Sequence, residues 1–121
     1  GLGPVHAMAP LLQRQQMDAS DIDYWEINEA FSAQVLACLS AWQDPAYCRA
    51  ELGLEQPFAA IPSERLNIDG GAIALGHPLG ATGAIRSATV VHALRRHNLK
   101  YGMVTMCVGT GQGAAGIFER V

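Results

Sequence analysis

Residues 102–121 read GMVTMCVGTGQGAAGIFERV, and this stretch sets one end of the predicted sheet. Its apolar run at 102–108 predicts a buried strand, residues 109–113 predict a turn, and residues 114–121 predict a last strand. Residues 111–116 match G-x-G-x-x-G, but in a dinucleotide-binding fold that loop opens a helix, and a further strand follows. Because only five residues remain after the match, the stretch predicts a hairpin rather than a nucleotide site.

The chain before this hairpin predicts helices and one more strand. Residues 4–17 are expected to form a helix that Pro10 kinks or interrupts, and residues 24–27 read as a short strand. A second helix is expected from Glu29, with one apolar face made by Phe31, Val35, Cys38 and Trp42.

Residues 43–66 carry three prolines and little periodicity, which predicts a surface excursion with a short helix around 46–52. A third long helix is expected to end near His97 and to bury Ala84, Ala88, Val91 and Leu94. The order of these elements predicts one α/β domain over residues 1–121. Its layers are a mixed β-sheet with helices on its faces, closed by the hairpin.

Composition excludes several classes of protein. Half of the residues are hydrophobic and 16% are charged, which is typical of a globular protein with a core. The net charge is −3, with Lys100 as the only lysine, which argues against a nucleic-acid-binding surface. Four basic residues close in sequence are expected to form a solvated helix end, with an anion site as the alternative: Arg86, Arg95, Arg96 and Lys100.

The three cysteines, Cys38, Cys48 and Cys107, are an odd number without CxxC spacing. This pattern argues against a disulfide framework or a metal site and fits a reducing cytoplasm. No apolar run reaches the roughly 18 residues that a membrane helix needs. With neither a signal peptide nor an initiator methionine, the sequence is expected to be a processed chain or a fragment.

The stretch GGAIALGHPLGATG, residues 70–83, has three interpretations: a phosphate cradle, a tight strand-to-helix turn, or a cleared space around His77. Its glycine spacing matches a phosphate-binding P-loop, but His77 and Pro78 stand where lysine and serine or threonine are needed. The phosphate interpretation is therefore disfavoured.

Two reactive side chains stand in glycine-rich settings, His77 before a helix and Cys107 at the end of a strand. Imidazole and thiol groups suit proton transfer near neutral pH, and Gly109 can bring a backbone N–H close to a substrate oxygen. Asn28 adds an amide at a strand-to-helix junction. Taken singly, each has a structural interpretation: a surface histidine, a core cysteine and a helix N-cap asparagine.

Taken together and in order, three motifs resemble the C-terminal domain of thiolases: NEAF at 28–31, NIDGGAIALGHPLGATG at 67–83, and TMCVGTGQGAAGIFERV at 105–121. The resemblance covers nearly the whole chain and is strongest to 3-ketoacyl-CoA thiolases, with acetyl-CoA acetyltransferases close behind. It implies a thiolase-like layered fold, of which this chain is the C-terminal half only.

The resemblance also implies roles for single residues. His77 would activate a nucleophilic cysteine and help to hold a thioester oxygen. Cys107 would exchange a proton with the acetyl α-carbon or the incoming thiol. Gly109 would supply an oxyanion-hole N–H, and Asn28 would position a water in the other oxyanion hole.

Ala30 and Phe31 would border the pantetheine or acyl pocket by the same resemblance. The implied reaction cleaves 3-ketoacyl-CoA with CoA to acyl-CoA and acetyl-CoA, or runs in reverse. Coenzyme A is then a substrate, no further cofactor or metal is expected, and the full-length protein is expected to be a homo-oligomer.

The chain departs from the family in two respects. The nucleophilic cysteine and the N-terminal half are missing, so the chain is expected to be inactive alone. The family's Gly-Ala-Arg reads Gly83-Ala84-Ile85-Arg86 here, which leaves the register of that helix open. A non-catalytic acyl-CoA-binding, lipid-binding or scaffold module that kept the fold is the alternative.

Overall fold

Strand β2, Tyr101–Val108, is the middle strand of a three-stranded sheet with the order β1–β2–β3 in a computed structural model that describes residues 1–121. Strand β1, Tyr24–Ile27, runs parallel to β2, with Tyr24 opposite Gly102 and Ile27 opposite Thr105. Strand β3, Gln112–Glu119, runs antiparallel to β2 and hydrogen bonds to no other strand. The predicted mixed sheet with a closing hairpin is confirmed.

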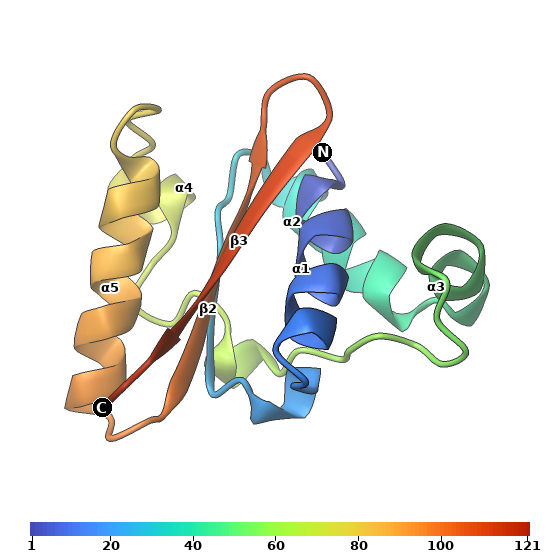
Figure 1. Cartoon of the computed structure of the whole chain (residues 1–121). Coiled ribbons are helices and arrows are strands. Elements are labelled where there is room, and N and C mark those ends of the chain that lie inside the picture. Colours follow the sequence, from blue (N-terminus) through green and yellow to red (C-terminus); the bar gives the residue numbers. More distant parts are fainter.

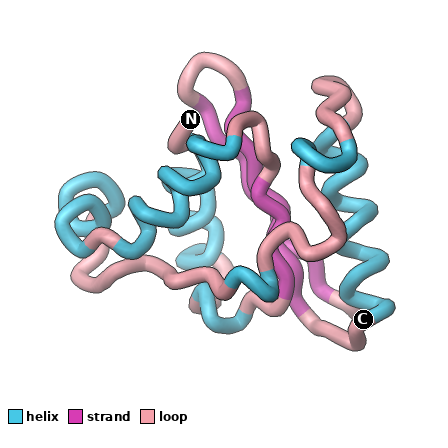
Figure 2. The backbone as a smooth tube through the Cα atoms, turned by 180° about the vertical axis from the view of Figure 1, so that it is seen from behind, coloured by secondary structure: helices cyan, strands magenta, loops and turns pink.

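Helices cover both faces of this sheet (Figures 1 and 2). Helices α1, Gly3–Arg14, and α2, Ser32–Gln43, enclose the larger core with one face, and Trp25, Trp42 and Met103 are fully buried there. Helix α5, Thr82–Arg96, encloses a smaller core with the other face, built from Tyr24, Val90, Ala93, Leu94 and Val104. The molecule is therefore an α/β domain of three layers.

The segment between α2 and the glycine-rich loop packs along the larger core. It contains the predicted short helix, α3, Pro45–Leu52, whose N-terminus is capped by the Asp44 carboxylate through the backbone N–H groups of Ala46 and Tyr47. Its Cys48 is fully buried, and the Cys48 thiol donates to backbone carbonyls of α2. A single turn of helix, α4, Ala72–Leu75, follows further along.

Helices α1 and α2 differ from expectation at their ends. Helix α1 continues through Pro10 without interruption and ends at Arg14 rather than near Met17. Helix α2 begins at Ser32, three residues later than predicted, and the Phe31 side chain is 74% exposed instead of buried. The other predicted members of that face, Val35, Cys38 and Trp42, are buried.

The predicted buried face of α5 is wrong except at Leu94. Ala84, Ala88 and Val91 are exposed, and the buried positions are Thr82, Arg86, Val90, Ala93 and Leu94. A hydropathy pattern cannot anticipate this register, because it depends on a buried arginine. Arg86 is 1% exposed and pairs with Glu26, so it is not part of a solvated helix end.

The hairpin turn is shorter than predicted, because β3 begins at Gln112 and leaves only residues 109–111 between the strands. The G-x-G-x-x-G match, residues 111–116, begins in this turn and continues within β3 instead of opening a helix, which confirms that it is not a dinucleotide loop. No helix of the chain combines the length and apolar character needed to cross a bilayer.

Candidate active site

The candidate residues come from the carboxyl ends of β1 and β2 and from the loop between α4 and α5. Asn28 directly follows β1, and Cys107 is the second-last residue of β2. Because these two strands are parallel, both residues lie at the same edge of the sheet. The β2–β3 turn and the α4–α5 loop lie at that same end of the molecule (Figure 1).

The glycine-rich loop is held against β1 by Glu29. The Glu29 carboxylate accepts a hydrogen bond from the backbone N–H of Ile73 at 3.2 Å. A Cβ on Gly71 would overlap this carboxylate, so the space that glycine leaves there is filled by Glu29 and not by a ligand. Gly76, directly before His77, has a φ of 98°, a conformation that side-chain-bearing residues avoid.

His77 is half-buried and held on both ring nitrogens. Its Nε2 lies 3.4 Å from Asn28 Nδ2, a long contact, and its Nδ1 lies 2.7 Å from Thr82 Oγ1. The Thr82 hydroxyl in turn reaches the Pro78 carbonyl at 2.9 Å. His77 is therefore neither a free surface histidine nor a core residue, since it is half-buried and both ring nitrogens have a neighbour.

Asn28 is 1% exposed, and its backbone N–H donates to the Thr105 carbonyl at 2.9 Å. Its side chain does not cap α2, whose N-cap position is Phe31, so the N-cap interpretation is wrong. The side-chain Oδ1 is buried and has no hydrogen-bond partner. A buried unpaired oxygen is costly, and a donor such as a bound water would satisfy it.

Cys107 is half-buried and makes no hydrogen bond with Asn28 or His77. Side chains alternate along a strand, so Cys107 faces the same side as Met103, which belongs to the larger core. Gly109, in the hairpin turn, is exposed, and a Cβ placed on it would meet nothing within 4 Å. Its backbone is thus open to an approaching group.

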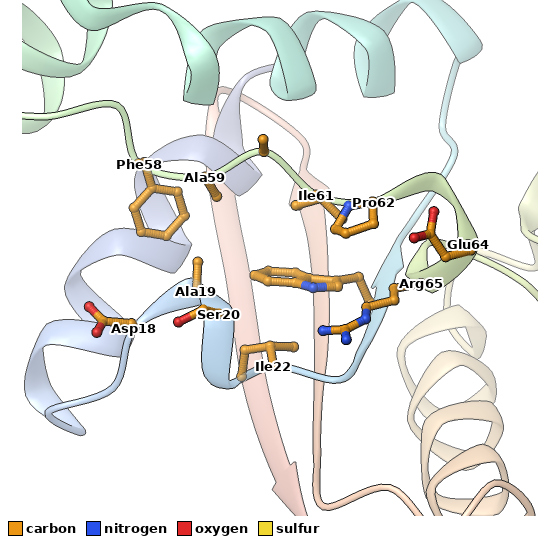
Figure 3. A pocket seen from close by; sticks show the side chains of 12 residues that line it. Asp18, Ala19, Ser20, Ile22, Phe58, Ala59, Ile61, Pro62, Glu64 and Arg65 are labelled. Carbon is orange, nitrogen blue, oxygen red and sulfur yellow. The ribbon is translucent and has the colours of Figure 1, made fainter.

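Ala30 and Phe31 line none of the main cavities of the structure. Phe31 points its ring to solvent, and Ala30 is only half-buried beside it. A cavity of about 660 Å³ does exist, between residues 18–25 and 58–65, and Figure 3 shows the side chains that line it. None of the predicted site residues lines this cavity.

A buried polar network supports the loop from behind. The Tyr24 hydroxyl donates to Glu26 at 2.9 Å, Arg86 contacts the other Glu26 oxygen at 3.5 Å, and Arg86 also donates to the Gly70 carbonyl at 2.9 Å. Burial raises the pKa of Glu26, against the opposing effects of the Tyr24 hydrogen bond and the Arg86 charge. Burial also raises the pKa of Tyr24.

Sequence reasoning missed Thr82 and Arg86 as residues that support the site. Thr82 follows His77 by five positions and stands at the first turn of α5, so its hydroxyl can reach back to the loop. That spacing could have been used to predict the contact between Thr82 and His77. Arg86 had none, because its partner Glu26 is distant in sequence.

A family model described as "Thiolase, C-terminal domain" matches residues 1–120. The 3-ketoacyl-CoA thiolases of Salmonella typhimurium and Klebsiella pneumoniae are 45% and 44% identical to the chain over 121 residues. The chain spans only 28% of the length of each of these relatives. A solved structure of an acetyl-CoA acetyltransferase from Syntrophomonas wolfei has a TM-score of 0.80 and 36% identity, covering 99% of this chain and 27% of that one.

Proposed function

This chain belongs to the thiolase family, as its C-terminal domain, and we propose that it supplies one part of an active site that cleaves 3-ketoacyl-CoA with CoA. The products are acyl-CoA and acetyl-CoA, and the reverse condensation uses the same groups. The observation that carries the proposal is the contact between His77 and Asn28, with the unpaired Asn28 oxygen beside it.

Carbon–carbon cleavage between two carbonyl groups leaves an enolate, whose negative charge needs fixed hydrogen-bond donors and a nearby acid. We assign the enolate oxygen to the His77 side of the site. A water held by the free Asn28 oxygen would donate to the enolate while satisfying that buried oxygen. The fixed donor is then supplied beside two residues that already contact each other.

Cys107 is proposed to exchange the proton with the acetyl α-carbon or the incoming thiol, as a partly exposed thiol at the strand end allows. Gly109 is proposed to donate its backbone N–H to the acyl oxygen, since nothing crowds that glycine. Ala30 and Phe31 are proposed to border the acyl or pantetheine group in the complete protein.

A thiolase also needs a nucleophilic cysteine, and neither remaining cysteine suits that role. Cys38 is fully buried, and burial raises the pKa of its thiol, which keeps it in the unreactive form. Cys48 is also fully buried, beneath α2. We therefore assign the nucleophile to a part of the protein outside these residues, as the 28% coverage of the relatives allows.

The test is thiolysis of acetoacetyl-CoA and of a longer 3-ketoacyl-CoA by this chain, alone and mixed with a separately made N-terminal thiolase half. Activity is expected only in the mixture, and His77→Ala or Cys107→Ala should abolish it. His92→Ala is the matched control, since His92 is an exposed histidine on α5 away from the loop, and its activity should be unchanged.

Full activity of the chain alone would overturn the assignment of the nucleophile. No activity in the mixture, with both parts folded and associated, would favour the alternative, a non-catalytic acyl-CoA-binding, lipid-binding or scaffold module. Free cysteines favour a cytoplasmic location, and the complete protein is proposed to be a homo-oligomer.

A further inference from the structure

The Thr82 hydroxyl contacts both the His77 ring and the backbone carbonyl of the next residue, Pro78. Thr82 is 1% exposed at the start of α5. Its Oγ1 lies 2.7 Å from His77 Nδ1 and 2.9 Å from the Pro78 carbonyl oxygen. We infer that Thr82 is a positioning residue that fixes the neutral His77 imidazole with its proton on Nδ1 and its lone pair on Nε2.

The number of protons available at these contacts decides the His77 tautomer. The Pro78 oxygen is only an acceptor, and it also accepts from the backbone N–H groups of Ala81 and Thr82, at 2.8 and 2.9 Å. Its 2.9 Å contact with Thr82 Oγ1 is favourable only when the single hydroxyl proton lies between the two oxygens. Thr82 Oγ1 then has only lone pairs left for His77 Nδ1. A 2.7 Å contact with that nitrogen is favourable only if Nδ1 carries a proton.

The other side of the ring agrees with this arrangement. Asn28 directs its Nδ2 donor, not its oxygen, toward His77 Nε2. A donor in that place suits an unprotonated Nε2 and opposes an Nε2–H group. The two contacts, made by residues from β1 and from α5, therefore select the same tautomer.

The consequence rests on the proposed function. A histidine that takes a proton from a thiol must present a lone pair at the nitrogen facing that thiol. Nδ1 is occupied by Thr82 at 2.7 Å, whereas Nε2 has only the long 3.4 Å contact with Asn28 Nδ2, which an incoming thiol would displace. Thr82 would thus keep His77 ready as a base without touching substrate itself, as partners of functional histidines do elsewhere.

The experiment measures the tautomer directly in this 121-residue chain by ¹⁵N NMR of the histidine side chains at about pH 8.5, where an ordinary imidazole is neutral. A protonated and an unprotonated ring nitrogen differ widely in ¹⁵N shift. We expect Nδ1 protonated and Nε2 unprotonated at His77. In Thr82→Val, which has nearly the same shape without the hydroxyl, the proton should move to Nε2.

Two variants serve as controls. Thr82→Ser keeps the hydroxyl and should keep the wild-type tautomer. Thr89→Val removes another α5 threonine hydroxyl, one that also bonds a carbonyl four residues back, at 3.0 Å, but reaches no histidine. It should leave the His77 signals unchanged.

A wild-type spectrum with the proton on Nε2 overturns the inference, and this measurement needs no variant to fold. An unchanged tautomer in folded Thr82→Val overturns it equally. In the reconstituted enzyme, Thr82→Val should lower kcat by about 10- to 100-fold with little change in KM, and raising the pH should not restore it. If the mixture proves inactive, the tautomer result still stands or falls by itself.

Discussion

Because the Glu26 carboxyl is buried, its titration makes the free energy of unfolding depend on pH. Burial raises the Glu26 pKa above its ordinary value of 4.5, so the folded protein binds that proton more tightly than the unfolded chain does. The contribution of this group to stability is therefore complete below about pH 4.5 and is lost as the pH rises through the raised pKa.

Glu26→Gln removes this titration. We expect the free energy of unfolding of the variant to fall less than that of the wild type between about pH 4.5 and the raised pKa, whatever constant offset the lost pairing with Arg86 adds. Urea unfolding over a series of pH values measures the two slopes. Glu51→Gln, at an exposed position on α3, is the control, and parallel curves for Glu26→Gln and wild type would contradict the prediction.

The sequence predicted His77 and Asn28 as site residues, and the structure brings them together. Resemblance to the thiolase motifs together with chemical fit selected them, not spacing alone. The two residues meet because each follows an element whose end lies at one edge of the sheet. The motifs could not show that Glu29 fills the space beside Gly71, since that contact depends on the packing of the loop against β1.

Helix α5 packs so closely on β2 that there is no room for a side chain at Gly102. A Cβ on Gly102 would overlap the Val90 side chain, which is fully buried and branched close to the helix backbone. Gly102→Ala should therefore destabilise the protein by about 1–3 kcal/mol, the usual cost of overpacking a core. Urea unfolding measures this difference.

Combining Gly102→Ala with Val90→Ala tests whether overlap with the Val90 side chain causes the loss of stability. In the double variant the new methyl group has room, so its loss of stability should be smaller than the sum of the two single losses. Additive losses would mean that the contact between Gly102 and Val90 is not what limits this interface.

The same interface explains which helix positions were predictable. The period of α2 was correct at Val35, Cys38 and Trp42, because apolar side chains dominate that face and Gln34 is the one polar residue buried on it. The period of α5 was wrong because it buries Arg86, whose charge is matched by Glu26 on β1. Apolar periodicity can predict a buried face made mainly of apolar side chains, but it misses one that buries a paired charge.

The first helix, α1, and the last strand, β3, cross in direct backbone contact and so join the two ends of the chain. A Cβ on Gly113 would overlap the backbone carbonyl of Gly3, so the start of α1 lies directly against the start of β3. Gly113 is also the partner of Cys107 in the hairpin register. This contact therefore joins the two ends of the domain beside a candidate functional residue.

Gly113→Ala should destabilise the domain by about 3 kcal/mol or more, because backbone atoms cannot rotate away from the added methyl group. Gly116→Ala is the matched control on the same strand, since its Cβ would meet only the Phe118 ring at 3.9 Å. That control should stay within about 1 kcal/mol of wild type. Equal losses in both variants, measured by thermal or urea unfolding, would contradict the prediction.

The parallel pairing of β1 with β2 has a further consequence for the order of events during folding. Residues 24–27 must wait for residues 102–105 before they can pair, so residues 28–101 intervene as a loop to be closed. Such distant pairings slow folding, and a chain leaving the ribosome forms them last. Asn28 and His77 are both synthesised before β2, so the Asn28 backbone N–H gains its partner, the Thr105 carbonyl, only after β2 has been made. Until then the chain exposes an unpaired β1, whose free backbone N–H and C=O groups are open to pairing with other chains.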